Sequence, residues 1–106
     1  MGDTLARVKA LAAAGDALLS QHAYDRLAEN GISTADIEAG IASAIEIEDY
    51  PEFHKGPSVL VLQQDMSGQP IHVLWGIRKG TAAPAIVITA YRPDPSRWTT
   101  DFRSRL

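Results

Sequence analysis

The first half of the chain has apolar residues at helical spacing. Leu5, Val8 and Leu11 lie three residues apart, and this pattern predicts a helix over Thr4–Ala14. Gly15 follows the last apolar turn and is typical of a helix end, because glycine readily adopts the left-handed conformation that closes a helix. We therefore expect a helix at the start of the chain.

Two more helices are predicted from their capping residues. After Ala17–Leu19, which is extended or turn-like, Ser20 is a suitable N-cap for a helix that ends at Asn30-Gly31. Ser33, with Asp36 three residues later, resembles a capping box at the start of a third helix. That helix would direct three isoleucines inward at four-residue spacing, namely Ile37, Ile41 and Ile45.

The second half of the chain has the pattern of strands. Ser58–Gln64, Ile71–Arg78 and Ala85–Arg92 are rich in β-branched residues and leucine, and turn residues separate them. Short connections favour an antiparallel meander, to which Ile45–Asp49 would add a fourth strand. Strands that are apolar on both faces need cover. The predicted fold class is therefore α+β, with two to three N-terminal helices packed on one face of a three- to four-stranded antiparallel sheet.

The composition is that of one globular domain over residues 1–106, with 45% hydrophobic and 22% charged residues. The chain has no cysteine, which excludes disulfides, thiolate nucleophiles and cysteine-ligated zinc. This usage fits a reducing cytoplasm, where we expect the protein. Because the start of the chain lacks a basic region followed by a long apolar run, we expect neither a signal peptide nor a membrane span.

Charge is distributed unevenly along the chain. Four basic and eleven acidic residues precede His72, whereas six basic and two acidic residues lie from His72 onward, and the formal net charge is -3. A local basic surface is what binding of a polyanion or an acidic partner requires. The alternative is that these charges are merely solvated, since four of the six basic residues lie in the last fifteen, where residues 99–106 would form a flexible tail.

Several short motifs between Ser20 and Trp98 together form a specific combination, although each alone is weak. They are Ser20-Gln21-His22-Ala23 with Arg26, Asn30-Gly31-Ile32-Ser33, Glu48-Asp49-Tyr50-Pro51, Gly56-Pro57-Ser58, Pro70-Ile71-His72-Val73, and Thr89-Ala90-Tyr91-Arg92-Pro93 with Trp98. On these motifs the chain resembles the bacterial domain-of-unknown-function family 4258 over residues 20–98.

The resemblance implies a compact fold similar to the RelE and BrnT toxins, which are commonly encoded beside a small antitoxin of the zinc-finger or helix-turn-helix type. It thereby predicts a toxin-like endoribonuclease whose partners are RNA, free or on the ribosome, and such an antitoxin. Many members of the family have a basic residue where Asn30 stands here. One phosphate contact of the family is therefore expected to be missing from this chain.

His22 and Arg26 are the first candidate site residues. They lie four residues apart on the predicted second helix, so both project from one face and could meet a phosphate together. Alternatively, His22 packs near the helix start and Arg26 pairs with a carboxylate such as Asp25, Glu29 or Glu48.

His72 is the second candidate, and it lies in a predicted strand. By simple alternation it shares its face with Leu74, Gly76 and Arg78. A glycine on that face would let a ligand or another backbone approach closely. The alternative is a hydrogen-bonded histidine that fills the sheet surface.

The last strand carries further candidates on alternate faces. Thr89 and Tyr91 share one face and Ala90 and Arg92 share the other, so Tyr91 and Arg92 cannot both reach one site unless the strand bulges. Tyr91 is typical of a core ring with a hydrogen-bonded hydroxyl, whereas Arg92, just before Pro93, is freer to turn toward a pocket.

A metal-independent ribonuclease needs a base for the ribose 2′-hydroxyl, cations at the phosphate and an acid for the leaving oxygen. His22 and His72 are the candidate base and acid, in either order, while Arg26 and Arg92 would hold the phosphate. The residues expected to orient or bind RNA are Tyr91, Thr89, Arg97, Trp98 and Arg78. No metal or cofactor is expected. This mechanism requires His22 and His72 to open onto one hollow rimmed by arginines.

Two other classes of function stay open, because a net negative charge does not favour a free RNA enzyme. A metal site could be assembled from His22, His54, His72 and the acidic stretch Glu46–Glu52, although no pair has a recognised ligand spacing. The other class is a non-catalytic interaction module that binds a protein through an exposed sheet edge or the arginine-rich tail.

Overall fold

A computed structural model describes residues 3–106 of the chain. Within this range the elements are α1 (Asp3–Ala13), β1 (Ala17–Leu19), α2 (Gln21–Asn30), α3 (Thr34–Gly40), the 3-10 turn η1 (Ile41–Ser43), β2 (Ile45–Tyr50), β3 (Ser58–Gln64), β4 (Pro70–Ile77) and β5 (Ala85–Tyr91). The α+β prediction is confirmed. No helix among these residues is long and apolar enough to cross a lipid bilayer.

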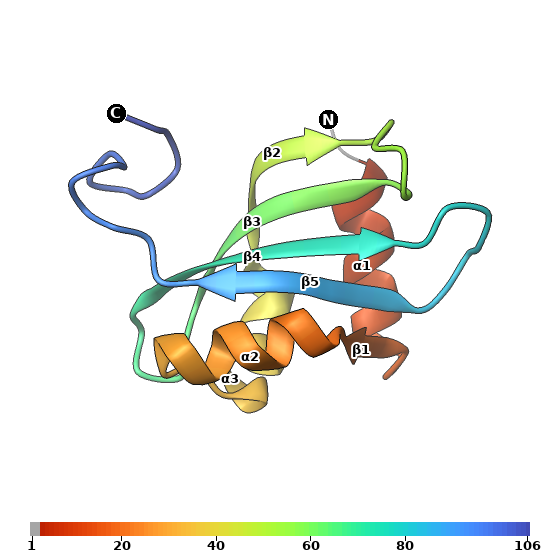
Figure 1. The fold of residues 1–106 in the computed structure, drawn as a ribbon, viewed down its shortest axis with the longest axis horizontal. Coiled ribbons are helices and arrows are strands. Elements are labelled where there is room, and N and C mark those ends of the chain that lie inside the picture. Colours follow the sequence, from red (N-terminus) through yellow and green to blue (C-terminus); the bar gives the residue numbers. More distant parts are fainter. Residues whose placement is uncertain (1–2) are drawn as a thin grey trace.

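The strands form one mixed sheet in the order β1-β5-β4-β3-β2 (Figure 1). The four strands β2 to β5 are antiparallel neighbours, as predicted. The strand β1 instead runs parallel to β5, with Ala17 opposite Ala85 and Leu19 opposite Val87. The expectation of a purely antiparallel sheet of three to four strands was therefore wrong in this respect. A run of three residues carries too little pattern to predict pairing with so distant a segment.

The predicted caps are present, but the third helix is shorter than expected. Ser33 and Asp36 form the capping box, and Gly31 closes α2 with a φ of 64°. The helix α3 ends at Gly40, where the chain passes so close to β3 that a Cβ would lie 2.7 Å from the Gln64 carbonyl oxygen. Ile45 therefore begins β2 and is exposed, so the prediction that it points inward was wrong.

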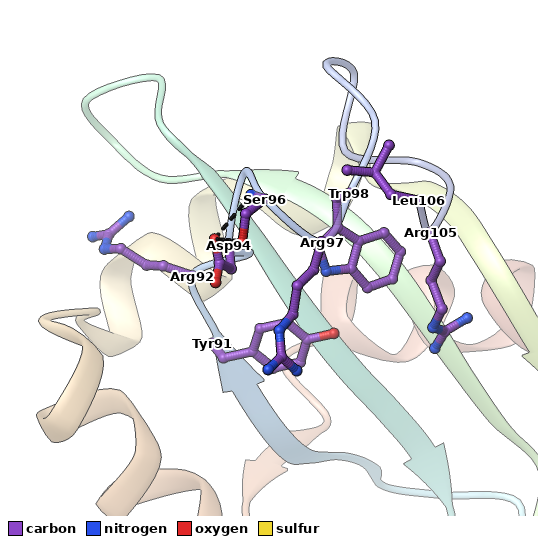
Figure 2. A pocket seen from close by; sticks show the side chains of 8 residues that line it. All are labelled: Tyr91, Arg92, Asp94, Ser96, Arg97, Trp98, Arg105 and Leu106. Atoms are coloured by element: carbon purple, nitrogen blue, oxygen red, sulfur yellow. Dashed lines mark hydrogen bonds between the residues drawn. The ribbon is translucent and has the colours of Figure 1, made fainter.

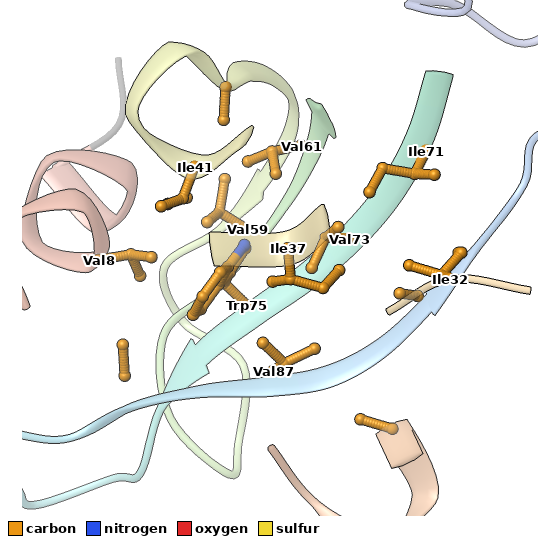
Figure 3. Close-up of a cluster of buried hydrophobic side chains, with 14 of the residues drawn as sticks. Val8, Ile32, Ile37, Ile41, Val59, Val61, Ile71, Val73, Trp75 and Val87 are labelled. Carbon is orange, nitrogen blue, oxygen red and sulfur yellow. The ribbon is translucent and has the colours of Figure 1, made fainter. Parts of the chain in front are cut away.

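One face of the sheet and all three helices share a single apolar core (Figure 3). Val8 from α1, Leu27 from α2 and Ile37 from α3 are buried with alternate residues of the inner strands. Val73 and Trp75 of β4 belong to this core, so their neighbours in β4 project from the opposite face. We call these the inner and the outer face of the sheet. The prediction that the helices cover one face is confirmed.

A buried polar network connects α3 to the inner face. The Gln63 side chain is 2% exposed, accepts a hydrogen bond from Trp75 Nε1 at 2.9 Å, and donates one to the Ile37 carbonyl oxygen at 3.1 Å. The oxygen and the nitrogen of the Gln63 amide thus each have a protein partner. The network fixes the position of α3 on β3 and β4.

The residues after β5 fold back on the sheet, and they include residues 99–106, for which the sequence predicted a flexible tail. The Thr99 amide donates to the Ser104 carbonyl oxygen, the Leu106 amide donates to that of Arg97, and Trp98 and Arg105 form an isolated β-bridge. Phe102 makes the reversal with a φ of 59°. We call residues 94–106 the C-terminal segment.

Replacement of Gln63 by alanine should destabilise the fold by about 2–4 kcal/mol, because the Trp75 N–H and the Ile37 carbonyl would lose their partner in a buried site. Gln64→Ala, at the neighbouring exposed position, is the matched control. Urea unfolding followed by circular dichroism measures both. Equal losses for the two variants would contradict the role of the network.

Candidate functional site

His72 lies on the outer face of β4 and is completely buried beneath the C-terminal segment. Its Nε2 lies 2.8 Å from the Phe102 carbonyl oxygen, and its Nδ1 lies 3.1 Å from the Tyr91 hydroxyl. Because a carbonyl only accepts, Nε2 carries the proton in the neutral ring. Nδ1 then accepts the hydrogen bond that the Tyr91 hydroxyl donates. The face predicted for His72 is confirmed, and so is the hydrogen-bonded alternative.

Burial sets the ionisation of this pair. Removal from water lowers the pKa of His72 below its ordinary value of 6.5, although the bond to the Phe102 carbonyl acts in the opposite direction. Burial also raises the pKa of Tyr91 above 10.0. Both groups are therefore neutral at pH 7, and a neutral imidazole accepts from a neutral phenol.

Trp98 covers His72 on the side away from the sheet. Its ring meets the imidazole edge to face with centroids 4.4 Å apart, and only 7% of Trp98 is exposed. The Arg105 guanidinium lies over the same indole, 4.9 Å from its centroid, and forms an ion pair with Glu48 of β2 at 2.8 Å. The hydrogen bond from Arg105 lowers the pKa of Glu48. The C-terminal segment is thus anchored to both β4 and β2.

An open pocket of about 690 Å³ lies between the end of β5 and the C-terminal segment (Figure 2). We call it the arginine pocket. Three guanidinium groups and two aromatic rings reach its walls. The lining residues are Tyr91, Arg92, Asp94, Ser96, Arg97, Trp98, Arg105 and Leu106. Four of the candidates from the sequence, Tyr91, Arg92, Arg97 and Trp98, therefore come together here.

Arg92 points away from the other two arginines (Figure 2) and binds the chain itself. Its Nε and Nη2 donate to the carbonyl oxygens of Asn30 and Gly31, and its Nη1 forms an ion pair with Asp65 at 3.0 Å. Every arm of the guanidinium thus has a protein partner. The expectation that Arg92 turns freely toward a pocket is not met, because it closes the C-terminus of α2 and connects it to the β3–β4 turn.

The charge available to a ligand comes chiefly from Arg97. Among residues 3–106, Arg92 and Arg105 have carboxylate partners within ion-pair distance, whereas Arg97 has none. Asp94 at the pocket wall accepts hydrogen bonds from the Ser96 amide and hydroxyl, and these lower its pKa. Within the range that the structure describes, the pocket therefore presents one guanidinium without an ion-pair partner, which lies beside the ring of Tyr91 and helps to lower the pKa of Asp94.

His22 and Arg26 do not take part in this pocket. They are exposed neighbours on α2, with Arg26 Nε 3.5 Å from His22 Nε2, and Arg26 is ion-paired with Glu29 at 3.0 Å. The residue after His22, Ala23, packs on the inner face, whereas His72 projects from the outer face beneath Trp98. The shared hollow expected for the two histidines is therefore not formed. Pairing of Arg26 with a neighbouring carboxylate, one of the alternatives, is confirmed.

Thr89 and Arg78 line other parts of the outer face. A bulge in β5 at Ile88, where the register with β4 shifts, lets Ile88 and Thr89 both border an apolar hollow beside Tyr91. Arg78 follows β4 and lines a further hollow with Lys55. These two candidates from the sequence are thus separated from the arginine pocket. The prediction that Thr89 and Tyr91 share a face is confirmed.

The three histidines lie apart in the fold, on α2, in the β2–β3 connection and on β4. In the described part of the chain no three residues of the types that ligate metals are grouped closely enough to hold an ion.

Two contributors to the site carry no signal in the sequence. The Phe102 carbonyl binds His72 because the chain reverses at that residue, and Arg105 reaches Trp98 and Glu48 through the same reversal. A positive φ at phenylalanine is rare and does not follow from any local turn motif. Only the Asp94-Pro95-Ser96 turn, typical of an Asx turn, marks the start of the segment.

The stability of the fold should fall with pH below about 6.5 through His72. Because its folded pKa is lowered, the unfolded chain binds the proton first, so the contribution is complete above 6.5 and is lost as the pH falls toward the folded pKa. His72→Gln keeps a donor and an acceptor but does not titrate. Urea unfolding between pH 5 and pH 8 measures the free energy of unfolding at each pH. This free energy should depend more steeply on pH in the wild type than in His72→Gln, by at most about 1.4 kcal/mol per pH unit. Parallel curves would show that His72 is not held neutral.

Comparison with known proteins places most of this chain in one family. A family model described as a domain of unknown function (DUF4258) matches residues 19–92, which is more than half of the chain. No curated protein and no solved structure matched the chain. The match includes His72, Tyr91 and Arg92 but ends before Arg97 and Arg105, so part of the arginine pocket lies beyond it. The chain belongs to the DUF4258 family.

Proposed function

We propose that the chain binds single-stranded RNA in the arginine pocket. The observation that carries the proposal is the convergence of Arg97, Arg105 and Tyr91 on one open pocket of about 690 Å³. Cations beside an aromatic ring are the combination by which proteins hold a phosphate and a neighbouring base. Arg97 would contact the phosphate, and Tyr91 would contact the ribose or base. Trp98, which is 93% covered, would support the site rather than stack with RNA.

The net charge of -3 is compatible with this proposal. Acidic residues are concentrated before His72, and the pocket is built from the cationic end of the chain. Since two of its three arginines are already paired, the electrostatic part of the affinity would come from one or two phosphates. We therefore expect weak, short-range binding of a few nucleotides instead of long-range attraction to RNA.

The toxin-like endoribonuclease that the resemblance to RelE and BrnT proteins implies is our second proposal, with a different catalytic group. His72 is buried, but the Tyr91 hydroxyl that donates to its Nδ1 borders the pocket. Tyr91 would take the proton of the ribose 2′-hydroxyl while passing its own proton to Nδ1. The 2′-oxygen would then attack the phosphorus, and the 5′-oxygen would leave with a proton from water. The hydroxide so formed would take a proton back through Tyr91, which restores the neutral imidazole of His72. The product would be a 2′,3′-cyclic phosphate.

In this mechanism Arg97 would neutralise charge on the phosphate. His22 and Arg26 would have no role, and Arg92 would act by holding α2 and β5 together. A RelE-like arrangement of the sheet and a small zinc-finger or helix-turn-helix antitoxin as partner belong to the same proposal. The supporting observation is the neutral Tyr91–His72 pair. Its phenol carries a proton and its Nδ1 can accept one, so neither group has to be deprotonated before the relay.

Arg97→Gln should weaken binding of a short fluorescent RNA about tenfold at low salt, because it removes the unpaired cation. The slope of log Kd against log salt concentration should also fall by about 0.7, the value for one phosphate on a single strand. Arg92→Gln is the matched control, since it removes a guanidinium that is engaged with the chain. Fluorescence anisotropy measures both. If Arg92→Gln, still folded, loses as much affinity as Arg97→Gln, the assignment is wrong.

Tyr91→Phe should lower the rate of RNA cleavage by about 10²–10⁴-fold, the usual contribution of a proton-transfer group. The ring and its packing would be kept. The assay follows total RNA in the presence of a chelator and identifies the fragment ends by mass. Wild-type rates in Tyr91→Phe would exclude the relay, and loss of wild-type activity on chelation would exclude a metal-independent reaction. RNA that is bound but not cleaved by the wild type would leave the binding proposal standing and end the second one.

A further inference from the structure

Beyond the arginine pocket, the outer face of the sheet carries an apolar groove. Two adjoining hollows of about 360 and 270 Å³ share Phe53, Ser58 and Ile88, and the first also borders Tyr91. Leu60, Leu74 and Ile86 complete the apolar floor and walls. The Ser58 hydroxyl already donates to the Gly56 carbonyl oxygen. The groove therefore offers hydrocarbon contact and almost no free donor, which does not suit RNA.

The wall of the groove on the β2–β3 side is anchored to the end of β4. The Ile77 amide donates to the Pro57 carbonyl oxygen at 3.0 Å, and the Lys79 amide donates to that of Lys55 at 2.9 Å. Gly56 permits this approach, since a Cβ there would collide with the Ile77 carbonyl oxygen. Phe53, which is 45% exposed, is thereby presented by a fixed loop. A preformed wall lowers the entropy cost of binding.

Both ends of the groove are cationic. Lys55 and Arg78 line one end, and among residues 3–106 neither has a carboxylate within ion-pair distance. Arg97 lies at the other end, where the arginine pocket meets the groove at Tyr91. Glu48 of β2 is paired with Arg105. A ligand with an apolar middle and negative ends would match this pattern.

The position of the groove argues for a helix. It lies on the face of β3, β4 and β5, where β3 and β4 have a strand on each side and β5 is paired with β4 and, at Ala85–Val87, with β1. A peptide lying on this face cannot add to the sheet as a further strand. A helix satisfies its own backbone hydrogen bonds and needs only apolar contact. From Ile86 to Tyr91 the groove spans about 17 Å at the usual rise of a strand, which is about eleven residues of helix.

We propose that this groove binds an amphipathic helix of about three turns from a protein partner, with apolar residues on Phe53, Leu74 and Ile88 and acidic residues at both ends. The partner is defined by this chemistry alone. The proposal does not depend on RNA binding, because the apolar floor of the groove belongs to the peptide site alone, although Tyr91 borders both sites and Arg97 would meet both ligands.

The test uses the whole chain and two capped synthetic peptides of about fourteen residues, each with the same leucine and alanine middle. One carries glutamates at both ends and the other carries lysines. The glutamate peptide should bind with a Kd on the order of 10–100 μM and gain helicity, while the lysine peptide should bind at least about tenfold more weakly. Isothermal calorimetry gives the affinities, and circular dichroism difference spectra give the helicity.

Phe53→Glu should reduce binding of the glutamate peptide by about tenfold or more, because it removes an aromatic contact and adds a repelling charge. Met66→Glu is the matched control, since Met66 is 71% exposed in the β3–β4 turn, away from the groove. A Lys55→Glu/Arg78→Glu chain should reverse the preference toward the lysine peptide. Both groups are at the protein surface, so neither variant depends on refilling a core.

Several results would overturn the proposal. They are no binding at about 1 mM peptide, equal affinity for the two peptides, and full affinity in Phe53→Glu. Concentration-dependent dimerisation that Phe53→Glu abolishes would instead assign the groove to a second copy of this chain. Loss of RNA binding in Phe53→Glu would assign it to RNA. Phe53→Glu separates the two proposals, because Phe53 lines the groove and not the arginine pocket, so this variant should lose peptide affinity and keep RNA binding.

Discussion

The buried imidazole of His72 is the interaction on which the outer face depends. It accepts from Tyr91 of β5, donates to the Phe102 carbonyl and packs against Trp98, so one side chain of β4 connects two strands and the C-terminal segment. A charged imidazole would fit this site badly, because Nδ1 would become a donor toward the phenol and the ring would carry its charge into a dehydrated place. The order of the C-terminal segment is thus coupled to a neutral histidine. Without that segment the arginine pocket would lose the wall that carries Arg97 and Arg105.

The two faces of the sheet have separate tasks. The inner face packs against three helices, and the Gln63 network connects α3 to it. On the outer face, the C-terminal segment packs over one end, and two hollows bordered by the β2–β3 connection lie open along β4 and β5. The bulge at Ile88 contributes to this arrangement, because it turns two consecutive residues of β5 outward and brings Tyr91 into line with His72. Simple alternation along β5 therefore gives the correct face on one side of the bulge and the opposite face on the other side.

Much of the fold followed from local signals in the sequence, and the site followed less well. The helix boundaries at Ser20, Ser33 and Gly31 depend on capping interactions within a few residues, and those predictions are confirmed. The alternation around His72 also gave its face correctly. What failed depended on contacts between distant residues, such as the parallel pairing of Ala17–Leu19 and the contact of Arg92 with the end of α2. Arginine before a proline carries the same sequence signal whether it binds a ligand or a helix terminus. Only the position of Asn30 and Asp65 decides between the two.

The position of Asn30 explains why Arg92 is engaged with the fold. Its side-chain oxygen accepts from the Arg92 amide and its carbonyl accepts from the Arg92 guanidinium, so this residue is where α2 and β5 are tied together. A basic side chain at the same position could not accept the amide, and it would place a second cation beside Arg92. A cation placed there would repel the Arg92 guanidinium from the helix end. In this chain Asn30 engages Arg92 in the fold, so the cation that remains for a ligand is Arg97. It lies in the C-terminal segment, which His72 holds on the sheet. The chemistry of the pocket is therefore set by a polar residue on α2 that does not itself line it.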